Sequence, residues 1–294
     1  MVKLAKPGPI AARLVRELRK VKNARVVDLP AFREGTSNAA ELQKSVASRD
    51  DLSDFHPAHA LYVYAQNQVS VLAEQLTALP ATSKLADLIE AAQEEYMPGG
   101  PPMSPLTTSY FTCWAFFDAA VGQQHETLGT CVLAVGTALG MDPSFLALVR
   151  AMQASAMSVY QHEGFNADGT TMLRDLVSGA RASCTVPSGW RGSLGDFLLG
   201  RVLPPPAGAL PVSVVFTTPY VLRGANERDW LAYFDRTMGA ARADANKSTS
   251  ALKFAIDWSE YIFAGYAGHV HEAIFLEGLP DVPKSLPHHD PRSR

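Results

Sequence analysis

The sequence predicts an α+β protein, with a mostly helical body and an inserted small antiparallel β-barrel or curled sheet of about five strands. Apolar residues recur at helical spacing as far as Met152, and between Met157 and Leu222 the spacing changes to short alternating runs. Helical spacing resumes at Asn226. The 294 residues are 47% hydrophobic and 19% charged, which is typical of a globular chain that can bury a large core.

Residues 1–25 form a basic amphipathic arm. Residues 10–21 place apolar side chains at helical spacing, and Glu17 is the one acid in the arm. The cations are Lys3, Lys6, Arg13, Arg16, Arg19, Lys20, Lys22 and Arg25. The whole chain has a formal charge of -3, so its remainder is net acidic. This asymmetry indicates either an anionic partner, such as nucleic acid or an acidic protein, or docking of the arm on its own chain.

Residues 26–155 form the predicted helical region. Its first part, residues 26–35, allows a short strand. Helices are expected over residues 38–46, 54–79, 82–97, 104–117, 126–139 and 143–152. The helix at 104–117 is apolar on nearly all sides, so we expect it to be central.

Residues 156–224 form the predicted small β-unit. The candidate strands are residues 158–163, 170–174, 180–186, 197–203 and 212–216. Asp168-Gly169 and Ser178-Gly179 are tight-turn pairs, and the stretch 189–195 is a glycine-rich loop. Such a unit is similar in architecture to small SH3-like or OB-like barrels, a likeness that transfers no active residue.

The chain ends with C-terminal helices in residues 225–273 and a proline-rich tail in residues 274–294. Helical spacing is expected over 227–242 and 252–266. The tail carries Pro280, Pro283, Pro287 and Pro291 and is expected to lie extended over the body or to stay mobile.

Net charge, cysteine spacing and proline positions argue against several classes of protein. The net charge argues against a protein that coats nucleic acid over its whole surface. Cys113, Cys131 and Cys184 are widely spaced, which favours a reducing cytoplasm over a disulfide framework or a zinc cage. Prolines interrupt both long uncharged runs, 96–117 and 202–222, so we expect no membrane insertion.

Histidines are the candidates for metal or acid–base chemistry. The groups are His269, His271 and Glu272; His288, His289 and Asp290; and His56 with His59. No group supplies a recognisable third and fourth ligand, so no metal is predicted. The alternative for the pair His56 and His59 is that they cap or cover the first turn of a helix.

A hydrolase would need a nucleophile with a base nearby. Ser188 lies on a candidate turn and His162 on a candidate strand, but no G-x-S-x-G motif or third orienting group accompanies them. Gly189, Gly192 and Gly195 lack a phosphate-binding context and are expected to supply turns. No cofactor is therefore predicted.

The leading functional hypothesis is a non-enzymatic cytoplasmic interaction protein, a subunit or adaptor of a larger assembly. The alternatives are a nucleic-acid-binding accessory protein that uses the arm, and a hydrolase or metal-dependent enzyme. The candidate residues for binding a partner or nucleic acid are Arg13, Arg16, Arg19, Lys20, Lys22, Trp190 and Arg191. For Trp190 a second interpretation is that it covers the end of the barrel core.

Overall fold

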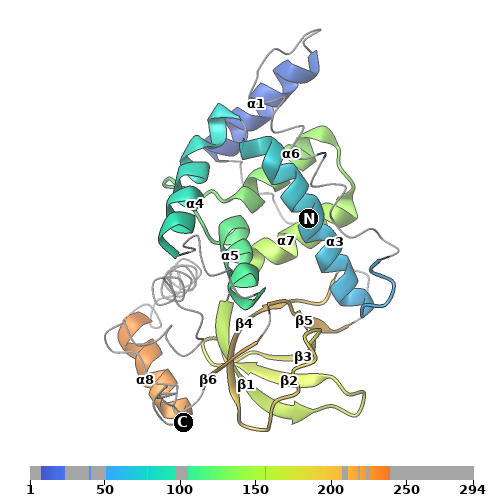
Figure 1. Ribbon diagram of the computed structural model, residues 1–294, viewed down its shortest axis with the longest axis vertical. Coiled ribbons are helices and arrows are strands. Elements are labelled where there is room, and N and C mark those ends of the chain that lie inside the picture. The colour runs from blue at the N-terminus through green and yellow to red at the C-terminus, as the bar shows by residue number, and fades with distance from the viewer. Residues whose placement is uncertain are drawn as a thin grey trace, which may run out of the picture. The chain divides into compact units, whose positions relative to one another are not determined.

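The computed structural model describes residues 8–23, 40, 51–77, 79–96, 105–155, 157–206, 211–217, 219–222 and 226–238 (Figure 1). Two compact units make up the chain. The first consists of Met1–Ala91, Trp114–Ala154 and Pro206–Leu210. The second consists of Ala92–Cys113, Ser155–Pro205 and Pro211–Arg294. Helices dominate the described part of the first unit, and the second contains the sheet.

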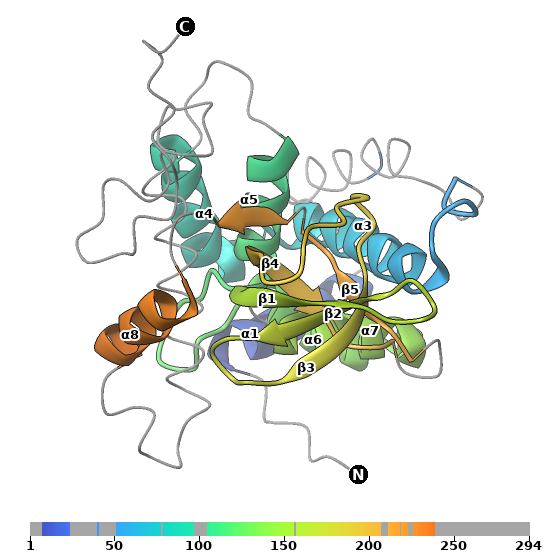
Figure 2. The ribbon, with the colours of Figure 1, turned by 90° about the horizontal axis from the view of Figure 1, so that it is seen from below.

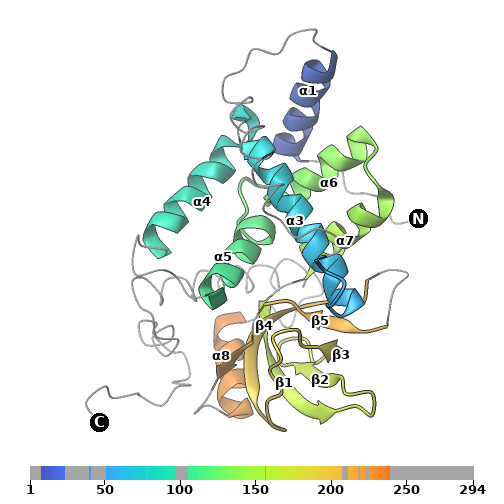
Figure 3. The same ribbon diagram turned by 45° about the vertical axis from the view of Figure 1, so that its right-hand side comes forward.

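The described residues contain seven α-helices and one short 3-10 helix. They are α1 (Pro9–Asn23), α3 (Pro57–Thr77), η1 (Pro80–Thr82), α4 (Ser83–Tyr96), α5 (Pro105–Phe117), α6 (Leu128–Leu139), α7 (Pro143–Ala154) and α8 (Glu227–Met238). In the first unit α1 packs against α6 and η1, and α3 packs against α6 and α7 (Figure 3). None of the helices in the described ranges has the length and apolar composition needed to cross a bilayer.

Local capping fixes where α6 begins and ends. The Thr127 side chain accepts a hydrogen bond from the backbone N–H of Thr130, and the Thr130 hydroxyl accepts one from the backbone N–H of Thr127. Gly140 takes a left-handed conformation with φ 72° and closes the helix. The helix predicted over 126–139 therefore starts two residues later, which leaves Glu126 outside it.

The second unit holds a six-stranded sheet. Its strands are β1 (Met157–Phe165), β2 (Thr171–Asp175), β3 (Arg181–Thr185), β4 (Phe197–Leu203), β5 (Ser213–Val215) and β6 (Tyr220–Leu222). The order is β1-β2-β3-β5-β4, and a further pairing of β1 with β4 closes the ring (Figure 2). Strand β6, labelled in Figure 1, pairs with β4. The five predicted strands are confirmed as a small barrel, and β6 is an addition to the prediction.

One pairing departs from the expected antiparallel pattern. Strands β3 and β5 run parallel, with Cys184 opposite Ser213 and Thr185 opposite Val214. A closed ring with an odd number of strands cannot alternate direction all the way round, so at least one neighbouring pair must be parallel. The barrel is therefore mixed because it is closed and has five strands.

The barrel core consists of inward-facing side chains from all five strands of the ring. They are Tyr160, Leu173, Cys184, Leu198 and Val215. Burial raises the pKa of Tyr160, so its hydroxyl stays protonated at neutral pH.

Several predicted segments lie outside the described residues. These are the strand at 26–35, nearly all of the helix at 38–46, the helix at 252–266 and the tail at 274–294.

Candidate functional site

Strand β1 ends in a β-bulge, and the His162 and Phe165 rings lie on either side of it. Pairing of β1 with β2 shifts register between His162 and Phe165, and Gly164 lies between them with φ 108°. Such a bulge redirects the side chains that follow it. His162 is accordingly 1% exposed, whereas Phe165 is 54% exposed.

The glycine-rich loop is fixed against β1. The His162 N–H donates to the Asp196 carbonyl at 2.8 Å, and the Gly195 N–H donates to the His162 carbonyl at 2.9 Å. Gly189, Gly192 and Gly195 have φ values of 76°, 60° and 91°. These glycines lie in the left-handed region, as their predicted role as turn residues requires.

Trp190 folds over this loop and covers the barrel core. Its partly buried side chain packs against the core cluster, as the second interpretation of this residue predicted. A Cβ placed on Gly192 would lie 2.2 Å from the indole ring. Only glycine at position 192 therefore lets the indole lie this close to the loop backbone.

Three rings and one aliphatic side chain form a surface that we call the aromatic rim, consisting of His162, Phe165, Trp190 and Leu194. The His162 ring meets Phe165 edge-on with centroids 4.8 Å apart and Trp190 with centroids 5.6 Å apart. Leu194 is 77% exposed, and its Cδ1 lies 4.0 Å from where a Cβ on Gly164 would be. The rim thus has a buried base at His162 and exposed side chains at Phe165 and Leu194.

One ring nitrogen of His162 accepts a hydrogen bond from the backbone. Its Nδ1 accepts a hydrogen bond from the Gly164 N–H at 3.2 Å, so the neutral ring carries its proton on Nε2. That Nε2 is buried and has no hydrogen-bond partner among the residues that the structure describes.

Ser188 and His162 are not assembled as a nucleophile and its base. The Ser188 hydroxyl accepts a hydrogen bond from the Trp190 N–H at 3.4 Å, within its own loop. No hydrogen bond joins Ser188 to His162, although both are described. The pair therefore lacks the contact that activates a hydroxyl nucleophile.

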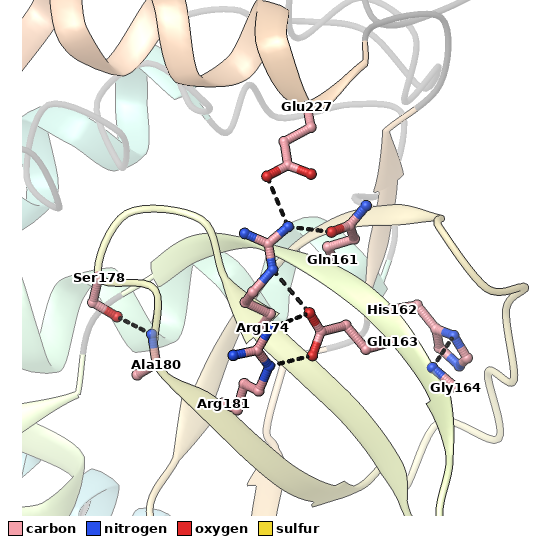
Figure 4. Close-up of polar contacts among 9 residues, drawn as sticks. All are labelled: Gln161, His162, Glu163, Gly164, Arg174, Ser178, Ala180, Arg181 and Glu227. Atoms are coloured by element: carbon pink, nitrogen blue, oxygen red, sulfur yellow. Dashed lines mark hydrogen bonds and ion pairs between the residues drawn. The ribbon is translucent and has the colours of Figure 1, made fainter.

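Two arginines of the sheet form ion pairs with acidic side chains. Glu163 accepts from Arg174 at 2.9 Å and from Arg181 at 2.7 Å, and Arg174 also meets Glu227 of α8 at 2.8 Å (Figure 4). The hydrogen bond from Arg181 is the main reason that the pKa of Glu163 lies below its ordinary value. Arg174 also contacts the side-chain oxygen of Gln161.

A third arginine of the sheet is held by a serine. Arg201 of β4 is buried and donates to the carbonyl and hydroxyl oxygens of Ser155 at 3.0 and 3.1 Å. Arg191 is exposed beside Trp190. In the described residues of the sheet, Arg174, Arg181 and Arg201 are thus each held by another residue of this chain.

The amphipathic arm is docked on its own unit through its apolar face. Ala11 and Leu14 are buried in α1, whereas Arg13, Arg16, Arg19 and Lys20 are exposed. Arg13 forms an ion pair with Glu17 at 2.8 Å. Lys22 belongs to α1, but its side chain lies outside the described part of the structure.

A buried carboxylate from far along the chain caps α1. Glu126, 4% exposed, accepts from the Ile10 N–H at 3.0 Å through Oε2 and from the Ala11 N–H at 2.8 Å through Oε1. A negative group at a helix N-terminus satisfies free N–H groups and complements the helix dipole. Gly8 is required here, because a Cβ on it would lie 2.2 Å from the Glu126 carboxyl carbon.

The described histidines do not form a metal site. The Ala58 N–H donates to His56 Nδ1 at 3.3 Å, so His56 caps the first turn of α3, as the alternative interpretation predicted. The described residues contain no group of three or more His, Cys, Asp or Glu placed to hold a metal. The groups at 269–272 and 288–290 lie outside the described residues.

Comparison with protein families, with curated proteins and with solved structures found no match to this chain. Its own geometry defines an α+β protein with a small closed mixed barrel of five strands. Two surfaces of this protein are candidates for binding: the aromatic rim and the basic face of α1.

Proposed function

We propose that this chain is a non-enzymatic cytoplasmic interaction protein, a subunit or adaptor of a larger assembly, and that it binds a protein partner through the aromatic rim. The observation that carries the proposal is the exposure of Phe165 and Leu194 on a fixed backbone. Five large apolar side chains are exposed in the described residues, and two of them share this rim. Clustered apolar side chains on a rigid surface are typical of contact sites.

The charges of the sheet support a protein partner over nucleic acid. Arg191 is exposed in the loop after Trp190, but Glu163 engages two arginines of the sheet. Binding of single strands combines aromatic stacking with a groove of open positive charge. Protein interfaces need an apolar centre with few charges, which fits the rim better.

The cysteines fit a reducing compartment. Cys113, Cys131 and Cys184 are free and buried. Burial raises the pKa of Cys131 and of Cys184 to about 12, so both thiols stay protonated at neutral pH.

Affinity capture with the full chain from its native host tests this proposal. We expect Phe165→Ser and Leu194→Ser to lose a partner that the wild-type chain retains, because each removes apolar contact area. Phe55→Ser is the matched control, since Phe55 is exposed but lies in the other unit. A lone monomer in size-exclusion chromatography with no captured partner, or equal losses in all three variants, would count against it.

A second candidate function is binding of nucleic acid through α1. The apolar face of α1 is already buried, so its outward face is cationic, and Arg16, Arg19 and Lys20 have no ion-pair partner among the described residues. Affinity for DNA should then fall steeply with added salt. Reversal of Arg16 and Arg19 to Glu should lower the slope of log affinity against log salt by about 0.9 for each lost phosphate contact. An unchanged slope would reject this function.

A further inference from the structure

The geometry points to an occupant for the aromatic rim. We infer that the proline-rich tail of this same chain, at its P-x-x-P sequence in residues 280–283, docks on Phe165 and Trp190. This inference rests on the proposed function, because it assigns a ligand to the same surface. The tail would then cover the rim until a partner displaces it.

The spacing of the prolines lies within the upper limit for the spacing of the rings. Because Phe165 and Trp190 both contact the His162 ring, at 4.8 and 5.6 Å, their centroids lie at most about 10 Å apart. A polyproline II segment rises about 3.1 Å per residue, so prolines three positions apart are about 9 Å apart. The upper limit on the ring separation therefore accommodates two prolines three positions apart, one on each ring.

Proline-rich segments suit an aromatic surface for a further physical reason. Their backbone is restricted before binding, so ordering them costs less entropy than ordering an ordinary peptide. The aromatic rings are also held in place, since Trp190 packs on the core and His162 is hydrogen-bonded into the loop. Both sides of the contact are thus preorganised.

Charge is complementary as well. The residues between Pro280 and Pro283 are Asp281 and Val282, and Arg191 is exposed next to Trp190. An aspartate between the two prolines can therefore face the exposed cation of the rim.

The connection is long enough for docking within one chain. Helix α8 ends at Met238, and Glu227 of α8 pairs with Arg174 of the sheet, so the connection starts from the unit that holds the rim. About 40 residues separate Met238 from Pro280. That number spans about 60 Å as a helix and about 130 Å when extended.

Titration of a labelled synthetic peptide of residues 278–291 tests the inference. Full-length chain with Pro280→Ala and Pro283→Ala should bind the peptide, because its own tail no longer competes. The wild-type chain should bind it about tenfold or more weakly, since a tethered segment acts at a concentration on the order of a millimolar. Phe165→Ser in the doubly substituted chain should lower the affinity by about tenfold, whereas the control Phe55→Ser should leave it unchanged.

Three results would overturn tail docking: no binding to the doubly substituted chain, equal binding to the wild-type chain, or binding that Phe165→Ser leaves unchanged. Capture of a host partner by the doubly substituted chain separates the two proposals. Capture that still depends on Phe165 would retain the proposed function after tail docking had failed. Loss of both peptide binding and Phe165-dependent capture would remove both.

Discussion

At the residue scale, Gly192 and Glu126 each fix the structure around them through a contact that the sequence pattern does not predict. Gly192 makes room for the Trp190 ring, and Glu126 caps α1 across 116 positions of the chain. The sequence predicts that Gly192 supplies a turn but does not predict which side chain fills the space. The sequence gives no indication that Glu126 caps α1, because it predicts this residue as the first of the helix at 126–139.

Gly192→Ala should displace Trp190 from the barrel end. The added methyl group would meet the indole ring, and φ 60° is strained for alanine, so we expect a loss of about 2–3 kcal/mol in the free energy of unfolding. Gly189→Ala is the control, because φ is 76° there but nothing lies within 4 Å of the added Cβ. Gly189→Ala should lower the free energy of unfolding by about 1 kcal/mol. Urea unfolding of both variants checks the difference, and equal losses would refute the proposed contact.

Glu126→Ala should weaken the docking of α1. The N–H groups of Ile10 and Ala11 would lose their buried acceptor, which costs about 1–3 kcal/mol in unfolding free energy. Glu126→Gln keeps one acceptor oxygen and should lose less. Hydrogen exchange of the α1 amides measures the effect directly, and protection unchanged in the alanine variant would contradict this role for Glu126.

At the element scale, helical spacing predicted α1 well but left its partner open. The sequence allowed either an external partner or the body of the same chain, and burial of Leu14 assigns the apolar face to the chain itself. Strand bounds were predicted closely where polar residues or prolines flank them. Strand β4 occupies residues 197–203 as expected, between Asp196 and Pro204.

Leu14→Ala and Arg16→Ala should differ strongly in their effect on the free energy of unfolding, although both lie on α1. Leu14 is fully buried, so its truncation should cost about 2–4 kcal/mol in unfolding free energy. Arg16 is exposed, so its truncation should stay within about 0.5 kcal/mol. Thermal unfolding compares the two, and a small loss for Leu14→Ala would show that α1 contributes little to the folded unit.

Helix α3 should make stability depend on pH. Burial, and then the neighbouring His56, lower the pKa of His59 below 6.5. Between the folded value and 6.5 the unfolded chain binds more protons, so unfolding free energy should fall as the pH drops through this window. Denaturant unfolding from pH 7.5 to 5 measures this fall. The variant His59→Gln should reduce the slope of unfolding free energy against pH. An identical slope in the variant would place the effect on another group.

At the scale of the whole molecule, the sequence predicted the α+β class and the five strands of the barrel but not how the ring closes. Alternating apolar residues reveal that a segment is a strand, yet the order β3-β5-β4 depends on contacts between distant segments. The bulge at Gly164 was missed for the same reason, and it is what turns Phe165 outward. The rim therefore could not be assembled from the sequence, although Trp190 was singled out there.

The most direct measurement is photo-crosslinking from position 165. A benzoyl-phenylalanine placed there in the full chain, within its native host, reports whatever touches the exposed edge of the rim. We predict crosslinks from this position to residues of the proline-rich tail or to a partner protein, well above those from the control position 55. Crosslinking no greater than at position 55 would contradict the claim that the aromatic rim is a contact surface.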